Sequence, residues 1–320
     1  MLASLDSSVF AVALLAGVLL DALLGEVRRF HPLVGFGRLA SAIEGRLNRN
    51  AVPLLRIARG ALAWMLAVLP AVLLAAWACA GSIPPLAQVA LHAVLLYFCL
   101  GLRSLRDHML PIGRALQAGD LAAARALTAR IVSRDTGNAA ESDLAKAATE
   151  SMLENGNDAV FGTLFWFAIA GGPGALLFRL ANTLDAMWGY RSERFNLFGR
   201  SAARIDDVFN YLPARLTAVC YAILAPGAEG TRRALACWRN QAPAWSSPNA
   251  GPVMSSGAGA LGLQLGGAAS YSGEIEQRPP LGAGAPASAA DIARAWRLVR
   301  NTTWLWVAAM LVLAYGVHHA

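Results

Sequence analysis

The sequence has few charged residues and a single lysine. Asp, Glu, Lys and Arg together make up 15% of the 320 residues, and Lys146 lies in the context Leu-Ala-Lys-Ala. A phosphate-binding loop needs a lysine after a glycine-rich turn, but neither G-x-x-x-x-G-K-[ST] nor H-E-x-x-H occurs in the chain. A P-loop ATPase and a zinc protease of the H-E-x-x-H type are therefore excluded.

Cysteine is also scarce. The four cysteines, Cys79, Cys99, Cys220 and Cys237, are isolated, and the first three lie in apolar runs. This spacing indicates neither a disulfide framework nor a zinc site, so we interpret them as small core residues.

Apolar runs dominate what remains. The chain is 56% hydrophobic with a mean hydropathy of +0.46, and a helix needs ~20 apolar residues to cross a bilayer. The first run is interpreted as a retained span, because no basic residue precedes it and no good cleavage site follows it. The uncharged runs predict about four transmembrane helices, at residues 8–24, 61–80, 83–102 and 301–320.

The distribution of arginine predicts the orientation. Seven arginines lie between the first two runs: Arg28, Arg29, Arg38, Arg46, Arg49, Arg56 and Arg59. The positive-inside rule then places residues 25–60, 103–158, 179–215 and 229–300 in the cytoplasm and both termini outside. The net charge of +7 is spread over juxtamembrane arginines rather than interleaved with aromatics, which favours contact with membrane lipid and no nucleic-acid binding.

Two apolar segments do not fit a simple alternation of membrane spans and cytoplasmic or external connections. Residues 159–178 are interrupted by Gly171-Gly-Pro-Gly174, and residues 216–228 are too short to span comfortably. We expect both to be re-entrant or buried helices. Residues 240–290, rich in Gly, Ala, Ser and Pro, are expected to form loops. The prediction is a single all-α integral membrane domain over residues 1–320, with cytoplasmic helical and loop segments.

A row of carboxylates is the first candidate for chemistry. Glu150, Glu154 and Asp158 are spaced four apart, which places them on one face of a helix beside Asn155. Like charges at this spacing repel, and Mg²⁺ held together with nucleotide phosphate would relieve the repulsion. All three are catalytic candidates, with Glu154 and Asp158 as metal ligands. The alternative is a solvated acidic face.

Two arginine-rich segments, residues 182–195 and 200–215, are the second candidate. Arginine captures phosphate or carboxylate through paired hydrogen bonds, so these segments suit an anionic substrate. The alternative is arginines that meet lipid headgroups. His31 before Pro32 and the turn at Asn249 are weaker candidates, and the Ser-Arg-Asp-Thr segment at 133–136 is expected to be a structural turn or cap. The predicted substrate-binding residues are His31, Arg38, Asn155, Asn182, Asp185, Tyr190, Arg191, Arg194, Arg204, Asp206, Asp207, Asn210 and Asn249.

Motifs in a fixed order carry a family resemblance. They are DALLGE (21–26), HPLVGFGR (31–38), SRDT (133–136), ESMLENGNDAVFGTLFW (150–166), NTLDAMWGYR (182–191), FGRSAARIDDVFNYLPAR (198–215) and SPNAG (247–251). From about residue 15 to 275 the chain resembles the CobD/CbiB family, the adenosylcobinamide-phosphate synthases of cobalamin biosynthesis. It departs from the family pattern at Ala159, where a glycine is expected after the aspartate, and keeps the carboxylate of Asp158.

The resemblance implies a ligase of the bacterial inner membrane whose active site faces the cytoplasm. It implies that a propionate carboxylate of adenosylcobyric acid is joined to the amine of (R)-1-amino-2-propanol or of its O-phosphate, with ATP consumed and Mg²⁺ required. The three carboxylates would then do metal or base work, and Arg191, Arg194 and Arg204 would hold phosphate or corrinoid carboxylates. Other enzymes of the pathway and further copies of the chain are open as partners.

Two other classes stay open. The AmpE-type inner-membrane proteins share this superfamily resemblance and are linked to sensing or signalling without synthesis, although the retained acidic and arginine clusters argue against that reading. Broken helices near charged residues also occur in transporters. Here the charges concentrate in expected cytoplasmic segments and no inverted halves are visible, which favours the enzyme.

Overall fold

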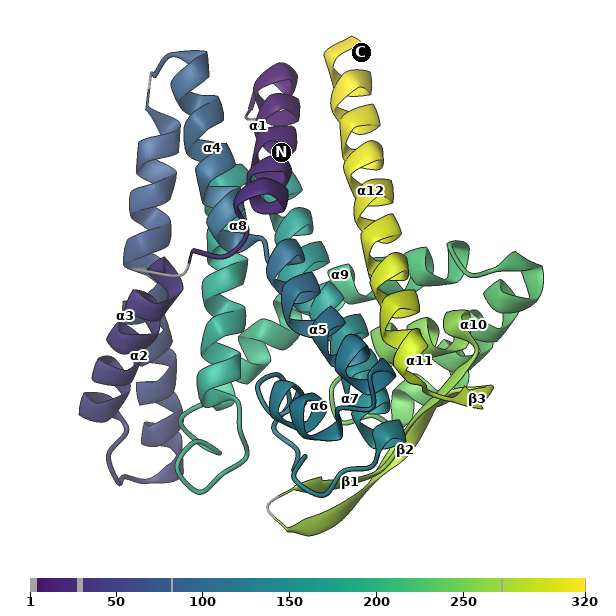
Figure 1. Cartoon of the computed structure of the whole chain (residues 1–320). Coiled ribbons are helices and arrows are strands. Elements are labelled where there is room, and N and C mark those ends of the chain that lie inside the picture. The colour runs from purple at the N-terminus through teal and green to yellow at the C-terminus, as the bar shows by residue number, and fades with distance from the viewer. Residues whose placement is uncertain (1–4, 28–30, 82, 272, 320) are drawn as a thin grey trace. The chain divides into compact units, whose positions relative to one another are not determined.

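The described residues of the chain form two compact units, each assembled from separate stretches of sequence. The computed structural model describes residues 5–27, 31–81, 83–271 and 273–319 (Figure 1). Unit 1 consists of Met1–Gly101, Gly162–Asn210 and Val307–Ala320, and unit 2 of Leu102–Phe161 and Tyr211–Trp306. Two of the long helices pass from one unit into the other, because α9 (Arg200–Ile223) and α12 (Ala289–His319) each contribute residues to both. The interpretation of residues 1–320 as one membrane domain stays a prediction.

Unit 1 is helical. It contains α1 (Ser7–Leu24), α2 (Pro32–Leu47), α3 (Pro53–Ala80), α4 (Pro85–Cys99), α8 (Gly162–Trp188), α9 (Arg200–Ile223) as far as Asn210, and the end of α12 (Ala289–His319). Proline begins α2, α3 and α4, where its fixed φ suits the first helical position and its missing N–H is not needed. Helices α3 and α8 pack together, and the core beside them contains buried Trp64, Trp188 and Phe198.

Unit 2 combines helices with a small sheet. It contains α5 (Leu102–Gln117), α6 (Leu121–Thr128), α7 (Glu141–Gly156), a π-helical turn (Asn157–Phe161), α10 (Gly227–Gln241), a 3-10 turn (Ala242–Ala244), α11 (Ala250–Leu261) and the remaining parts of α9 and α12. Strand β1 (Leu263–Tyr271) pairs antiparallel with β2 (Glu274–Gly282) and parallel with the short β3 (Ala285–Pro286). Helix α11 is buried on every side and packs against α10.

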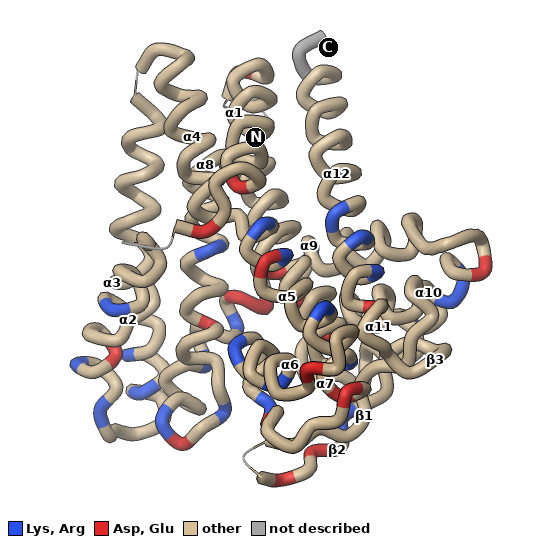
Figure 2. Tube along the Cα trace, viewed as in Figure 1, with Lys and Arg blue, Asp and Glu red and all other residues tan. Residues whose placement is uncertain are grey.

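Five helical stretches are long and apolar enough to cross a membrane among the described residues. They are Ser7–Leu24, Pro53–Ala80, Pro85–Gln117, Glu141–Trp188 and Ala289–Gly316. Two of them contain the predicted spans 8–24 and 61–80, and two overlap most of the predicted spans 83–102 and 301–320. The fifth includes the segment 159–178, for which we expected a re-entrant or buried helix, so the count by length and composition is five rather than four. Within unit 1, the chain from the second half of α3 through α4 carries no charged residue (Figure 2). The sidedness of these helices stays a prediction.

The predicted interruption at Gly171 is present as a kink inside α8. Ala170 and Gly171 leave helical geometry, and Gly171 has a φ of 62°. The backbone N–H of Gly172, which the kink frees, donates a 2.8 Å hydrogen bond to Nδ1 of His92 on α4. A buried histidine therefore satisfies the backbone group that the glycine-proline break would otherwise leave unpaired.

The expectation of loops over residues 240–290 was wrong. Residues 250–261 form α11, and residues 263–271 and 274–282 form the paired strands β1 and β2. Small residues allow this close packing, because a Cβ at Gly257 would lie 2.8 Å from a methyl carbon of Leu153. Residues 216–228, for which we expected a re-entrant or buried helix, comprise the end of α9 and the start of α10. Their placement relative to the membrane stays a prediction.

Candidate functional site

The acidic segment of unit 2 runs from α7 into a π-helical turn. Glu150 and Glu154 lie one turn apart on α7, as their spacing predicts, whereas Asp158 lies in the π turn Asn157–Phe161. Single π turns inside helices are frequent at functional sites because they shift the side chains that follow. Asp158 accepts a 2.9 Å hydrogen bond from Asn157, which itself accepts one from Thr217 at 3.0 Å. No three His, Cys, Asp or Glu side chains among the described residues are grouped to hold a metal ion.

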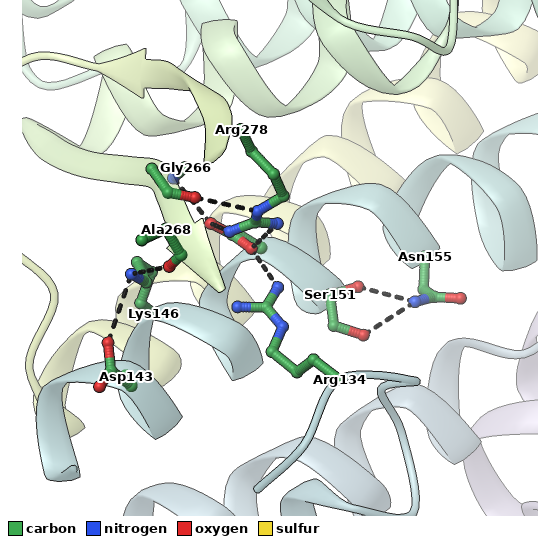
Figure 3. Close-up of polar contacts among 10 residues, drawn as sticks. Arg134, Asp143, Lys146, Ser151, Asn155, Gly266, Ala268 and Arg278 are labelled. Atoms are coloured by element: carbon green, nitrogen blue, oxygen red, sulfur yellow. Dashed lines mark hydrogen bonds and ion pairs between the residues drawn. The ribbon is translucent and has the colours of Figure 1, made fainter. Parts of the chain in front are cut away.

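Glu150 is engaged by three donors. Arg278 of β2 donates from both terminal nitrogens, at 3.0 and 3.2 Å, and the backbone N–H of Gly266 donates at 2.7 Å (Figure 3). Arg134 of the Ser-Arg-Asp-Thr segment donates to the same carboxylate. Glu150 is only 2% exposed, so these bonds offset the cost of burying its charge. The residue fastens both the hairpin and residues 133–136 to α7.

A β-bulge in the hairpin presents the backbone donor to Glu150. The register shifts between Gly266 and Gly267, which have φ angles of 73° and 70°. A Cβ at Gly266 would lie 2.3 Å from the carbonyl oxygen of Pro279, so only glycine fits there. Arg278 pairs with Gly267 across the hairpin and donates Nε to its carbonyl at 3.2 Å. The bulge therefore places the N–H of Gly266 and the guanidinium of Arg278 within hydrogen-bonding distance of the Glu150 carboxylate.

Glu154 has unused hydrogen-bonding capacity. It interacts electrostatically with Glu150, Arg134 and Arg278. No described residue donates a hydrogen bond to its carboxylate. The neighbouring Asn155 bonds back to Ser151, at 2.9 Å to the carbonyl and 3.0 Å to the hydroxyl. A carboxylate with free lone pairs beside two arginines is suited to bind a cation or to take a proton.

Unit 1 contains an arginine-lined pocket. Its volume is about 440 Å³, and it brings together four of the predicted residues, Tyr190, Arg191, Arg204 and Asp207, with Arg200. Burial raises the pKa of Asp207 above its ordinary value, and the nearby Arg191 opposes this shift. Three arginines facing one pocket with a single carboxylate are suited to bind an anion.

A buried polar network lies beside this pocket on α9. Asp206 is 7% exposed and accepts hydrogen bonds from Asn210 at 3.0 Å and Asn182 at 3.3 Å. Burial raises the pKa of Asp206 to about 6, although the two amide hydrogen bonds act in the opposite direction and the neighbouring Asp207 adds to the rise. The predicted residues Asn182, Asp206 and Asn210 therefore form one hydrogen-bonded group.

The other predicted residues lie outside the acidic segment and the arginine pocket, and three of them have structural partners. Arg194 donates to both oxygens of Glu44, at 3.1 and 2.5 Å, so it connects the segment after α8 to α2. His31 accepts from the backbone N–H of Leu33 at 3.2 Å and caps α2. Asn249 accepts from Arg215 at 2.8 Å. Arg38 is exposed on α2, and Asp185 lies half-buried in the last turn of α8. Their assignment to substrate stays a prediction.

Three residues at these sites were absent from the predicted set. Arg134 was inside a segment that we expected to be structural, and Arg278 was inside the expected loops. Arg200 lies at the start of the arginine-rich segment 200–215 but was not among its predicted substrate-binding residues. The motif position of Arg134, close in sequence to the acidic segment, is the one signal that pointed toward it.

Five candidate membrane helices with buried, charged sites define a multi-pass helical membrane protein. The family model described as "CobD/Cbib protein" matches residues 14–299, and the chain belongs to this CobD/CbiB family. It is 55% identical to the cobalamin biosynthesis protein CobD of Stutzerimonas stutzeri over 97% of this chain and 98% of the relative. The CobD proteins of Chromobacterium violaceum and Mycobacterium tuberculosis are 52% and 40% identical, over 97% and 91% of this chain and 99% and 91% of theirs. No solved structure matches the chain.

Proposed function

We propose that the chain joins the propionate carboxylate of adenosylcobyric acid to the amine of (R)-1-amino-2-propanol or of its O-phosphate. The reaction forms an amide, consumes ATP and yields adenosylcobinamide or its phosphate. The family membership supports the pathway, and the free carboxylate of Glu154 beside Arg134 and Arg278 is the observation that supports the chemistry. An amide synthase needs such a group for two reasons.

The first reason is activation of the acyl donor. A carboxylate is a poor acyl donor until one of its oxygens is phosphorylated or adenylylated, and the ATP phosphates that supply this group carry negative charge. Mg²⁺ is commonly held by one or two carboxylates together with substrate phosphates, and it offsets that charge. Glu154, with Asp158 in the adjoining π turn, fits such a partial ligand set. Arg134 then stabilises the same charge from the protein side.

The second reason is the nucleophile. The amine of the amino alcohol is an ammonium ion near neutral pH and must lose a proton before its lone pair attacks the acyl carbon. A carboxylate without hydrogen-bond donors is available to accept that proton. Glu150 is not available in this way, because three donors already occupy its oxygens. We therefore assign Glu150 to positioning and Glu154 to contact with the reacting groups.

The pocket of unit 1 suits the anionic groups of a substrate. Arg191, Arg200 and Arg204 line it, and each guanidinium presents a planar fork to a carboxylate or a phosphate. We assign this pocket to a phosphate or carboxylate of the substrates. We place both sites on the cytoplasmic side, in agreement with the arginine-rich connections of the sequence.

Conversion of adenosylcobyric acid by the detergent-purified protein tests the proposal. The protein is supplied with ATP, Mg²⁺ and either aminopropanol or its phosphate, and the products are identified by mass spectrometry. We expect a corrinoid whose mass corresponds to one new amide, and the preferred amine identifies the natural nucleophile. No product with either amine, from protein shown to be folded, would contradict the synthase and favour the AmpE-like sensing alternative.

A further inference from the structure

Unit 2 contains a cavity of its own, and none of the predicted site residues lines it. Its volume is about 680 Å³, and its walls are residues 134–139, the first half of α7 and the β1–β2 hairpin. Cavities of roughly 300–1,000 Å³ are typical of sites for drug-sized ligands and cofactors. A phosphorylated three-carbon amino alcohol would leave most of this space empty, whereas a nucleotide would fill it.

Hydrogen bonds hold the walls of the cavity in place. The backbone N–H of Asp135 donates to the carbonyl of Ser270 at 2.8 Å. The carboxylate of Asp135 accepts from the backbone N–H of Gly273 at 2.7 Å and from the hydroxyl of Ser270 at 3.0 Å. These bonds join residues 133–136 to the hairpin, and the contacts of Glu150 join both to α7. The cavity is therefore formed before any ligand binds.

Two cations at the cavity have donors to spare. Arg134 lines it and bonds Glu150 through one terminal nitrogen, and its other N–H groups have no partner among the described residues. Lys146 donates to the carbonyl of Ala268 at 3.3 Å and lies 3.3 Å from a carboxylate oxygen of Asp143 (Figure 3). An ammonium group has three donors, so one remains. Both cations can donate hydrogen bonds to phosphate oxygens.

The rest of the lining suits a flat, apolar group. Leu144, Ala147, Ala268 and Ala269 contribute small or apolar surface, and Ile275 of β2 lies at the edge with 73% of its surface exposed. Small side chains leave room for a planar ring, and an exposed isoleucine gains by covering one face of it. The cavity thus combines an apolar part with a cationic part.

We propose that this cavity binds the nucleoside triphosphate, with the base against Ala268 and Ile275 and the phosphates at Lys146 and Arg134. The inference rests on the proposed ATP-dependent synthesis and gives it a nucleotide site. Arg134 connects the two features, because the guanidinium that lines the cavity also bonds Glu150, one helical turn from Glu154. Phosphates bound at Arg134 therefore lie beside the carboxylate assigned to Mg²⁺.

Two substitutions test the site by different means. Ala268→Leu fills the apolar part, and Lys146→Gln removes a cation. Matched controls on α10 are Ala236→Leu, at an exposed alanine, and Arg239→Gln, at an exposed arginine, both in unit 2 and outside the cavity lining. Binding of the Mg²⁺ complex of a non-hydrolysable ATP analogue to the detergent-purified protein is measured by titration calorimetry. We expect each test variant to bind at least tenfold more weakly and each control to stay within twofold of the unchanged protein.

Failure of the inference differs from failure of the proposed function. Unchanged nucleotide binding in both Ala268→Leu and Lys146→Gln, in a protein that makes the amide, would overturn the nucleotide site and leave the synthase standing. Absence of both amide formation and nucleotide binding in the unchanged protein would overturn the synthase itself. The thermal unfolding midpoint of every variant is recorded, and a variant that no longer unfolds cooperatively is replaced by Ala269→Leu at the same wall.

Discussion

Arg278 donates two hydrogen bonds to Glu150 across 128 residues of sequence. The pair is buried, with side chains that are 8% and 3% exposed, and a third contact to Gly266 connects the same carboxylate to the hairpin bulge. Removal of Glu150 leaves the buried guanidinium of Arg278 without this partner, whereas removal of Arg278 leaves Glu150 with Arg134 and Gly266. The pair therefore determines how the hairpin lies against α7 and fixes one wall of the nucleotide cavity.

Loss of Arg278 should release the hairpin. We expect Arg278→Ala to lower the stability of unit 2 by about 1.5–3 kcal/mol, the usual worth of hydrogen bonds to a charged group, because Arg134 still pairs with Glu150. The variant should also speed amide hydrogen exchange in strands β1 and β2. Arg278→Lys keeps the charge but not the paired geometry, so its stability should lie between that of Arg278→Ala and that of the unchanged protein. Hydrogen exchange in Arg278→Ala that matches the unchanged protein would show that the ion pair does not hold the hairpin.

Glu154 should be needed for the reaction but not for the fold. We expect Glu154→Gln to lower amide formation at least 100-fold, because the amide side chain neither binds Mg²⁺ well nor accepts a proton. The matched control is Glu141→Gln, at an exposed glutamate in the first turn of the same helix. Product is measured over a range of Mg²⁺ concentrations. Equal activity of the two variants would remove Glu154 from the catalytic centre.

Two arginines of unit 1 should behave differently. Arg204 lines the unit 1 pocket, whereas Arg194 pairs with Glu44. We expect Arg204→Gln to raise the KM for one substrate about tenfold or more with little change in the unfolding midpoint, because a charge-assisted contact with substrate is lost. Arg194→Gln should change the unfolding midpoint more than the KM. The reverse pattern would exchange the roles given to these two residues.

Asp206 should make stability depend on pH. Its pKa is about 6 in the folded chain against an ordinary value of 3.8, so the folded state binds the proton more tightly and stability falls as pH rises from about 4 to about 6. Asp206→Asn cannot ionise and should lack this loss, which amounts to up to about 3 kcal/mol. The difference in unfolding midpoint between the variant and the unchanged protein should therefore grow in favour of the variant from pH 4.5 to 7.5. Parallel pH profiles would contradict the raised pKa.

Local sequence patterns predicted the helices and part of each site. The uncharged runs located four apolar helices, the Gly171-Gly-Pro-Gly174 break located the kink in α8, and the segment 182–207 supplied four residues of the arginine pocket. These features depend only on composition and on residue spacing along a single helix, and both can be read directly from the sequence.

The remaining features depend on contacts between distant segments. The hairpin was missed because Gly266, Gly267 and the alanines around them are typical of loops. The carboxylate that bonds both the bulge and Arg278 belongs to Glu150, more than 100 residues away in sequence. The spacing of the acidic residues predicted one face for all three, but the π turn removed Asp158 from the regular helix. The partner of Arg194 on α2 lies 150 residues away and left no local signal.

The most direct test of the account follows the oxygen atoms of the corrinoid carboxylate. Adenosylcobyric acid labelled with ¹⁸O in its free propionate carboxylate is converted by the purified protein with ATP, Mg²⁺ and the preferred amine. If the carboxylate is activated by ATP, amide formation leaves one labelled oxygen in the product and transfers the other to inorganic phosphate or to AMP. Mass spectrometry should find one label in phosphate or AMP for each amide formed, whereas amide product accompanied by unlabelled phosphate and AMP would contradict ATP-dependent activation at this centre.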